Sequence, residues 1–241
     1  MFAPEAFALW LDHHEHTDAA GFTYHYHSRS DAHSKELARL IWVDLLVCCP
    51  EIRRDQQAGL VTMKVNYKHT WPATSKTKTI DLAVGTTSPG DLLDEVRISC
   101  ELKAVMTEHK KSQPRVFDEL SSSHQIVHAA DARAIAAGLT VVNIANRFVS
   151  PLRQRPGVPI SVTRHKQPDV TRSMVMHLRG LQLRGELSQE GFDAYCTVVV
   201  ECDNQGPARL WTASPSPQPG EPDHYATFLA RIGTAYRAHY G

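Results

Sequence analysis

Apolar and polar residues alternate along three early segments of the chain, and this period of two predicts β-strands. The segments are GLVTMKVNYK (59–68), TIDLAVG (79–85) and VRISCELKAV (96–105). A nearly continuous apolar run at 139–148 is typical of a strand covered on both faces, and YCTVVVEC (195–202) predicts a further strand. The polar segment 69–78 is expected to form a turn region.

Apolar residues spaced three and four positions apart predict helices elsewhere, beginning with the segment 30–50. A polar segment at 106–115 leads into a helix of roughly two dozen residues that ends near Gly138. Two more helices are expected at 169–181 and 223–240. The order α-β-β-β-α-β, then α-β-α, predicts an α/β fold with a mixed central β-sheet flanked by helices.

Composition narrows the class of protein without naming a function. The 241 residues suit one domain, 1–241, and an apolar content of 42% is enough for a sizeable core. The five cysteines show no metal-ligand spacing, so we expect free thiols in a reducing, cytoplasmic compartment. The N-terminal segment lacks the basic region of a signal peptide, and no window is long and apolar enough to predict a membrane span.

Charge is balanced overall but uneven along the chain. The formal net charge is zero, so no global field attracts nucleic acid or membrane. Residues 147–184 nevertheless carry eight Lys or Arg and one acid, and residues 56–80 carry four Lys and no acid. These stretches are either solvated surface or a pair of basic loops that flank a groove.

The strand ISCELKAV (98–105) places charge where a core strand is expected. Its apolar positions share one face, while the other face carries Ser99, Glu101 and Lys103. In the segment 79–85, Ile80 and Leu82 are expected on one face and Asp81 on the other. If the two strands are neighbours, Asp81, Glu101 and Lys103 converge, and buried charges of this kind need partners or a metal. The alternative is an exposed Glu101–Lys103 pair, with Asp81 near a turn.

Two carboxylates and one backbone carbonyl make an all-oxygen site. Asp81, Glu101 and the carbonyl of Leu102 are therefore candidate ligands for Mg²⁺, with Mn²⁺ as a substitute. Such an ion can orient a phosphodiester, polarise its phosphoryl oxygen and lower the pKa of a bound water. Lys103 can hold or deprotonate that water, or stabilise the charged phosphate.

This pattern resembles the signature of the PD-(D/E)XK nuclease superfamily. Asp81 is followed, after nineteen residues, by Glu101-x-Lys103 on a predicted strand, and the order of elements over about residues 30–148 is similar to the restriction-endonuclease-like core. The resemblance implies that Asp81 and Glu101 bind the metal and that Lys103 is the catalytic lysine. It also matches Glu36, on the preceding helix, to an acidic residue that assists the metal site. Residues from about 149 to 241 would then be a C-terminal elaboration.

The chain departs from that family pattern in two places. Ile80 precedes Asp81 where the motif has proline, and Gln125 is followed four positions on by Ala129 instead of tyrosine. The second departure disfavours an end-processing exonuclease and leaves an endonuclease.

Basic residues after the candidate strand and in the second basic stretch are candidate contacts to DNA phosphates. They are Lys110, Lys111, Arg115, Arg153, Arg155, Arg164 and Lys166. Two symmetric sites are the simplest route to a double-strand break, so a homodimer on double-stranded DNA is expected. Its interface would come from the 168–181 helix, the 194–202 strand or the apolar face of the last helix, unless these segments only extend and cover the sheet.

Three functions remain open from the sequence. The first is a metal-dependent DNA endonuclease of restriction or phage-defence type. The second is a DNase effector that a ligand or partner activates and that cuts with little sequence preference. The third is a catalytically inactive nuclease-like domain that binds DNA or protein. The histidines at 13–16 and 25–27 form no regular zinc motif, and His124 and His128 share one helix face, where packing is the expected role.

Overall fold

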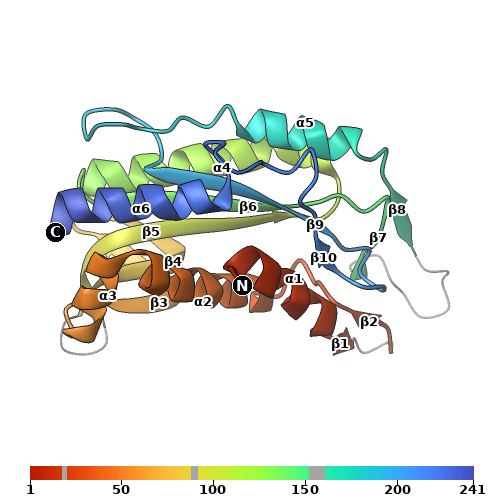
Figure 1. Cartoon of the computed structure of the whole chain (residues 1–241), viewed down its shortest axis with the longest axis horizontal. Helices are drawn as coiled ribbons and strands as arrows, with labels where there is room; N and C mark the ends of the chain where they lie inside the picture. The colour runs from red at the N-terminus through yellow and green to blue at the C-terminus, as the bar shows by residue number, and fades with distance from the viewer. Residues whose placement is uncertain (18–20, 88–91, 152–160) are drawn as a thin grey trace.

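The structure is a computed structural model that describes residues 1–17, 21–87, 92–151 and 161–241. The helices pack around one central sheet (Figure 1). The helices are α1 (Ala3–His13), α2 (Ala32–Cys48), α3 (Pro50–Gln57), α4 (His109–Ala130), α5 (Asp169–Leu178) and α6 (Tyr225–Tyr240). The strands are β1 (His16–Thr17), β2 (Thr23–Tyr24), β3 (Thr62–Trp71), β4 (Lys76–Thr87), β5 (Leu93–Val105), β6 (Ile135–Asn143), β7 (Arg147–Val149), β8 (Val162–Arg164), β9 (Ala194–Glu201) and β10 (Arg209–Leu210).

The central sheet is mixed, as the sequence predicts. Its strand order is β10-β9-β6-β5-β4-β3. Strands β3, β4 and β5 pair antiparallel, β5, β6 and β9 run parallel, and β10 pairs antiparallel at the far edge. Strand β9 comes from the C-terminal part of the chain, yet it pairs directly with β6, so the last hundred residues complete the same sheet.

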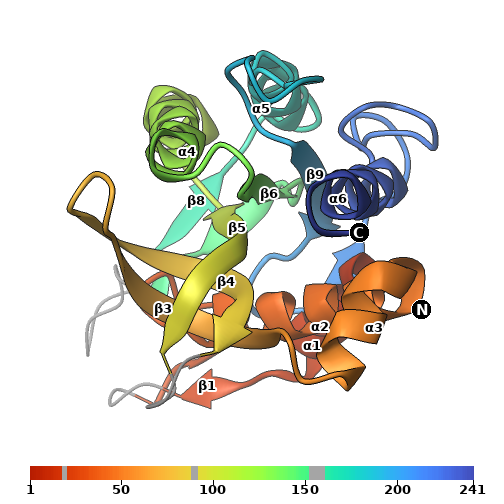
Figure 2. The same ribbon diagram turned by 90° about the vertical axis from the view of Figure 1, so that its left-hand side faces the viewer.

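Helices cover both faces of the sheet. Helices α4 and α5 lie on one face, and α1, α2, α3 and α6 lie on the other (Figure 2). The larger core cluster joins α1, α2 and α6 to one side of β4, β5, β6 and β9. The smaller cluster lies beneath α4 and α5. Within the described residues, none of the helices combines the length and apolar character needed to cross a bilayer.

Helix α2 is anchored by a buried acid within its apolar stripe. Asp44 lies in line with Ile41 and Leu45, and its Oδ2 accepts hydrogen bonds from the Ala3 N–H (2.6 Å) and the Tyr225 hydroxyl (2.8 Å). One carboxylate thus joins the starts of α1 and α6 to α2. A buried carboxylate with two donors is a satisfied group, so this polar residue in an apolar stripe serves packing.

The expected end of the long helix is wrong. Helix α4 ends at Ala130, and Gly138 lies in the middle of β6, where it pairs with Glu101 on one side and Tyr195 on the other. A Cβ at Gly138 would lie 3.1 Å from the Tyr195 ring and 3.2 Å from the Phe192 ring. The run Ala-Ala-Gly resembles helix in isolation, but here small residues make room for aromatic rings packed on a central strand.

Two further expectations about the first strands need correction. Residues 69–78 are mostly strand, because β3 continues to Trp71 and β4 begins at Lys76, which leaves a short turn between them. Ile80 and Leu82 do not share a face: Ile80 belongs to the cluster beneath α4, and Leu82 to the cluster beneath α2. The strand pairing is interrupted between them, opposite Asn66, whose φ of 50° breaks the regular pleat of β3.

Helices α1 and α3 were not expected from the sequence. Both begin with a proline in the first turn, at Pro4 and Pro50, where the missing N–H costs nothing. The segment 30–50 was expected to form one helix, but α2 ends at Cys48 and Pro50 begins α3. The buried residues of α3 are Ile52 and Asp55, too few for a periodic apolar pattern.

Candidate functional site

Strands β4 and β5 separate at Asp81, and this fork is the centre of the candidate site. The ladder between them ends at the pair Leu82–Cys100. One residue further, the Asp81 Oδ2 accepts a hydrogen bond of 2.8 Å from the backbone N–H of Leu102. The side chain therefore takes the place of a strand partner at the position where the ladder stops.

Glu101 lies beside the fork between two lysines. Its carboxylate is buried, with Oε2 2.6 Å from the Lys78 ammonium and Oε1 2.6 Å from the Lys103 ammonium. Lys78 comes from β4 and Lys103 from β5, so neighbouring strands each supply one cation. Each oxygen of a buried carboxylate has its own cationic partner, which is the condition for keeping such a group ionised.

Helix α4 closes the cluster from above. The Glu119 Oε2 lies 3.2 Å from the Lys103 ammonium. One turn further along the helix, the buried Ser123 hydroxyl accepts a hydrogen bond from the Lys78 ammonium and lies 3.5 Å from the Glu101 Oε2. The expected face with Ser99, Glu101 and Lys103 is thus covered by a helix and is not an exposed sheet surface.

The carboxyl groups of the site differ in pKa. Burial raises the pKa of Asp81 to about 6, and the negative charge of Glu101 adds to the rise. Burial also acts to raise the pKa of Glu101, but the ammonium groups of Lys78 and Lys103 outweigh it and hold that pKa below its ordinary value. For Lys103, burial acts to lower the pKa, yet the carboxylates of Glu101 and Glu119 raise it. Lys103 is therefore a cation in the metal-free protein and not a free base.

Oxygen atoms at the fork are candidate ligands for a hard divalent cation. In an extended strand the N–H and C=O of one residue point to the same edge, so the Leu102 carbonyl faces the fork together with its N–H. Asp81, Glu101 and this carbonyl give three oxygen donors, and Mg²⁺ commonly binds one or two carboxylates with water in the remaining positions. In the described part of the chain, no group of three or more His, Cys, Asp or Glu side chains is placed to hold a metal, so backbone and water oxygens would complete the shell.

The charges of the cluster are nearly balanced. Above the pKa of Asp81, three carboxylates (Asp81, Glu101 and Glu119) stand against two ammonium groups and the Arg115 guanidinium, whose Nε lies 4.0 Å from Glu119. A bound cation would therefore compete with the lysines, because both Glu101 oxygens now contact ammonium groups.

Glu36 does not join this cluster. It lies on α2, on the opposite side of the sheet from α4, and forms an ion pair of 3.5 Å with Arg39 one turn along the same helix. The sequence predicts that Asp81, Glu101, Leu102 and Lys103 lie together. In the structure Asp81 accepts a hydrogen bond from the Leu102 N–H, and Glu101 pairs with Lys103.

Sequence reasoning missed the partners that complete the cluster: Lys78, Glu119 and Ser123. Lys78 had been counted only within a basic stretch, although its position three residues before Asp81 on one strand was a usable signal. No pattern in the sequence indicates that α4 crosses the sheet at Glu119 and Ser123.

The candidate phosphate contacts divide into two groups. Lys110 and Lys111 are exposed on the first turn of α4, and Arg115 follows with its Nε 4.0 Å from the Glu119 Oε1. Arg164 at the end of β8 and Lys166 are also exposed. Across the residues that the structure describes, Lys110, Lys111, Arg164 and Lys166 form no ion pair, whereas Arg153 and Arg155 lie outside the described residues.

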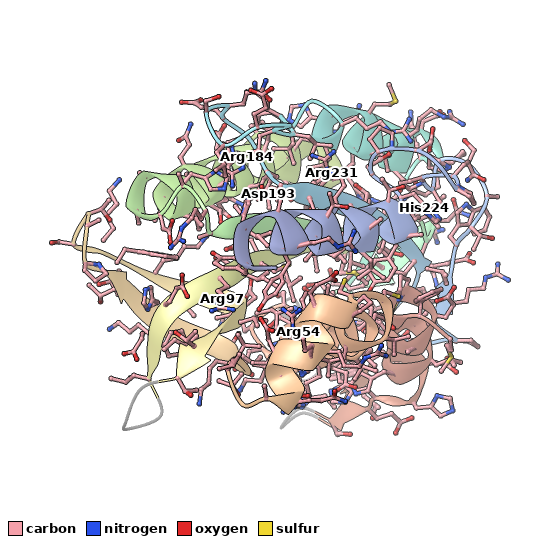
Figure 3. The ribbon with its side chains drawn as sticks, turned by 60° about the vertical axis from the view of Figure 1, so that its left-hand side comes forward. Arg54, Arg97, Arg184, Asp193, His224 and Arg231 are labelled. Atoms are coloured by element: carbon pink, nitrogen blue, oxygen red, sulfur yellow. The ribbon has the colours of Figure 1, made fainter. Side chains whose placement is uncertain are left out.

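Other arginines of the second basic stretch are neutralised by acids. Arg147 pairs with Asp203, and Arg172 pairs with Asp169. Arg184 is buried, and its Nε lies 2.7 Å from Asp193, beside the α6 residue Arg231 (Figure 3). The buried Arg184 serves the fold, and surface ion pairs engage Arg147 and Arg172, so the stretch offers fewer free cations to a duplex than its sequence suggests.

The two helix histidines pack as expected. His124 makes an edge contact with the Phe192 ring at 5.0 Å, and the His128 Nε2 lies 3.1 Å from the Asp193 carboxylate. The Asp193 carboxylate therefore contacts His128 and Arg184 and also accepts a hydrogen bond from the Ala136 N–H. This group fixes the start of β6 to the loop before β9.

We expect Asp81→Asn to stabilise the metal-free protein at pH 8 by roughly 1–3 kcal/mol, because it removes a buried negative charge. The folded pKa of about 6 lies above the ordinary value of 3.8, so wild-type stability falls as the pH rises through that window. The gain should therefore shrink toward pH 4. Urea unfolding in EDTA across this range measures it, with Asp118→Asn on the exposed side of α4 as the control. An equal gain at every pH would contradict the assignment.

No protein-family model, no curated protein and no solved structure matches the chain. The site is therefore described by its own residues: a fork between β4 and β5 with Asp81 and the Leu102 backbone, and a buried Glu101 between two lysines.

Proposed function

We propose that the protein is a metal-dependent endonuclease that hydrolyses phosphodiester bonds of double-stranded DNA, with a restriction or phage-defence role and a restriction-endonuclease-like core. The single observation that carries the proposal is the fork itself. Two carboxylates and a backbone carbonyl lie together beside two ammonium groups, in a cluster that a helix covers. Oxygen ligands for a hard cation next to cations for a phosphate are the groups that phosphodiester hydrolysis needs.

Asp81, Glu101 and the Leu102 carbonyl would hold Mg²⁺ or Mn²⁺ in this proposal. When bound, the ion supplies Lewis-acid polarisation of the phosphate and a more acidic water. The protein's own contribution is to position donors and charges. Asp81 is held in place by the Leu102 N–H, and its ionisation near neutral pH makes it ready to bind a cation.

The two lysines act on the phosphate and on water. Lys78 and Lys103 each contact one oxygen of Glu101, and a cation held by Glu101 would compete with these contacts and leave both ammonium groups able to donate hydrogen bonds. Lys103 keeps Glu119 as a second partner, so it stays at the fork and can stabilise the negative charge that develops on the phosphate. Lys78 stays near through the Ser123 hydroxyl.

Exposed cations around the site support a nucleic-acid substrate. Lys110 and Lys111 stand at the start of α4, and Arg164 and Lys166 lie at and just beyond the end of β8. Unpaired surface cations of this kind bind phosphates without reading sequence. A cytoplasmic location belongs to the same proposal, and it is supported by the five cysteines, all of which are free thiols.

One observation favours a second candidate, a nuclease that a ligand or partner activates. Both oxygens of Glu101 are occupied by ammonium groups, so the metal-free site is closed by its own lysines. An activator that moves α4 would shift Ser123 and Glu119, and with them the two lysines. Under the third candidate, a binding domain without activity, the same ion pairs would be permanent.

We expect Asp81→Ala, Glu101→Gln and Lys103→Met each to lower plasmid cleavage by at least the order of 10²–10³-fold, because each removes a metal ligand or a phosphate donor. Lys78→Met should lower it less, and Lys76→Met, an exposed lysine two residues earlier on β4, should leave it unchanged. Cleavage is measured on supercoiled plasmid with and without Mg²⁺. Discrete fragments support the first candidate and a ligand-dependent smear the second. Cleavage that persists unchanged in Lys103→Met would remove that residue from the site.

Affinity for DNA should fall steeply with salt despite the zero net charge, because bound lysines and arginines release counterions. The double variant Arg164→Gln, Lys166→Gln should lower the slope of log affinity against log salt by about 2. Arg172→Gln is the control, since Arg172 is paired with Asp169. Fluorescence anisotropy with a labelled duplex gives the slopes, and an affinity that salt does not change would exclude these phosphate contacts.

A homodimer remains part of the proposal, although two of the expected interface segments are used elsewhere. Strand β9 lies between β6 and β10, and the apolar face of α6 is buried in the core, so both extend and cover the sheet. Helix α5 keeps Met176 exposed. Light scattering at micromolar concentration should give twice the mass of the chain, and a monomer that makes clean double-strand cuts would refute the dimer.

A further inference from the structure

A pocket of about 430 Å³ opens beside the start of α4. The end of β5 and the turn after it, residues 104–108, form one wall, and the first two turns of α4 form another. Phe148 of β7 and Tyr26 complete it. We call it the α4 pocket. Its volume falls in the range of about 300–1,000 Å³ that small-molecule sites occupy.

The α4 pocket adjoins the fork through a chain of charged contacts. Ala104, which lines the pocket, directly follows Lys103 on β5. Arg115 also lines it, and its Nε lies 4.0 Å from the Glu119 Oε1. The other oxygen of Glu119 lies 3.2 Å from the Lys103 ammonium. A ligand in the pocket would therefore lie one or two side chains from the site proposed to cut DNA.

The lining combines an apolar floor with a cationic rim. Val105, Met106 and Phe148 belong to the buried core, so the floor is apolar and includes one aromatic ring. At the rim, Lys111 and Arg115 are exposed cations, and the exposed acid Glu108 belongs to the same lining. A ligand that matches both parts has a flat apolar body and an anionic group at one end.

The backbone adds to this polarity. Glu108 precedes α4 with a left-handed conformation (φ 54°, ψ 38°), which is uncommon for a residue other than glycine. It turns the chain from the end of β5 into the helix at the edge of the pocket. The N-terminus of this 22-residue helix carries a partial positive charge, so it favours an anion at the end of the pocket where Lys111 lies.

We propose that the α4 pocket is a nucleotide-binding subsite, with the base on the apolar floor and the phosphate at Lys111 and Arg115. Bases stack on aromatic and apolar side chains whatever their sequence, and phosphates pair with Lys and Arg. Two sources could supply this nucleotide. One is a nucleotide of the bound DNA beside the cut phosphate, and for this source the inference rests on the proposed nuclease function. The other source is a free nucleotide, which would act on the fork through Arg115 and Glu119.

Filling the pocket tests this proposal. Ser112 lines the pocket on α4, so Ser112→Trp should block it, while Ser122→Trp places the same ring on an exposed part of the same helix. If Ser112→Trp does not fold by circular dichroism, the double variant Lys111→Gln, Arg115→Gln removes the rim charges instead. The two probes are deoxyadenosine monophosphate, titrated by calorimetry, and a duplex with 2-aminopurine, followed by fluorescence in EDTA.

The two probes separate the two sources. A free nucleotide is supported if the monophosphate binds the wild type and Ser122→Trp but binds Ser112→Trp at least tenfold more weakly. A nucleotide of the substrate is supported if only the duplex responds, with 2-aminopurine fluorescence that rises on binding and does not rise with Ser112→Trp. Absence of both signals overturns the pocket assignment, whether or not the protein cuts plasmid. Binding of the monophosphate by a protein that never cuts DNA would keep the pocket and remove the nuclease function.

Discussion

A buried carboxylate needs cations, and the arrangement around Glu101 follows from that need. Glu101 lies on the central strand β5, beneath α4, where an unpaired negative charge would be too costly to keep. Lys78 and Lys103 each take one of its oxygens. Their own partners, Ser123 and Glu119, both lie on α4, so the helix that covers this face is also tied to it by charge. The contacts that pair the buried charges therefore also hold α4 on the sheet.

The break in the β4–β5 ladder leaves backbone polar groups of Leu102 available to the charged cluster. If β4 and β5 had stayed paired beyond Leu82 and Cys100, the Leu102 N–H and C=O would have been used by the sheet. Their separation leaves the N–H to Asp81 and the carbonyl facing the fork. The raised pKa of Asp81 follows from the same enclosure. Asp81 thus ionises near neutral pH, and the two lysines keep the nearby Glu101 ionised. Two such carboxylates can bind a cation.

The C-terminal part of the chain supports the site from a distance. Strand β9 completes the parallel side of the sheet next to β6, and α6 packs on the face opposite α4. The buried pair Arg184–Asp193, joined by His128, fixes the loop before β9 to α4. Several arginines of the 147–184 stretch are thus paired with acids, and the buried Arg184 among them holds the fold.

The sequence by itself determined the class of the fold and the residues of the fork. Alternation in β5 places Glu101 and Lys103 on one face, because the period of a strand fixes which residues share a face, but in β4 it failed around Asp81, and the pairing of β4 with β5 comes from the structure. The sequence could not place Glu119, Ser123 or the partners of Lys78, since the crossing of a helix over a sheet is decided by packing between distant segments. The same limit explains Gly138, whose local sequence resembles helix but whose place in β6 depends on the rings of Phe192 and Tyr195. The sequence shows the local periodicity of each helix and strand, whereas only the folded structure shows which residues of different layers are neighbours.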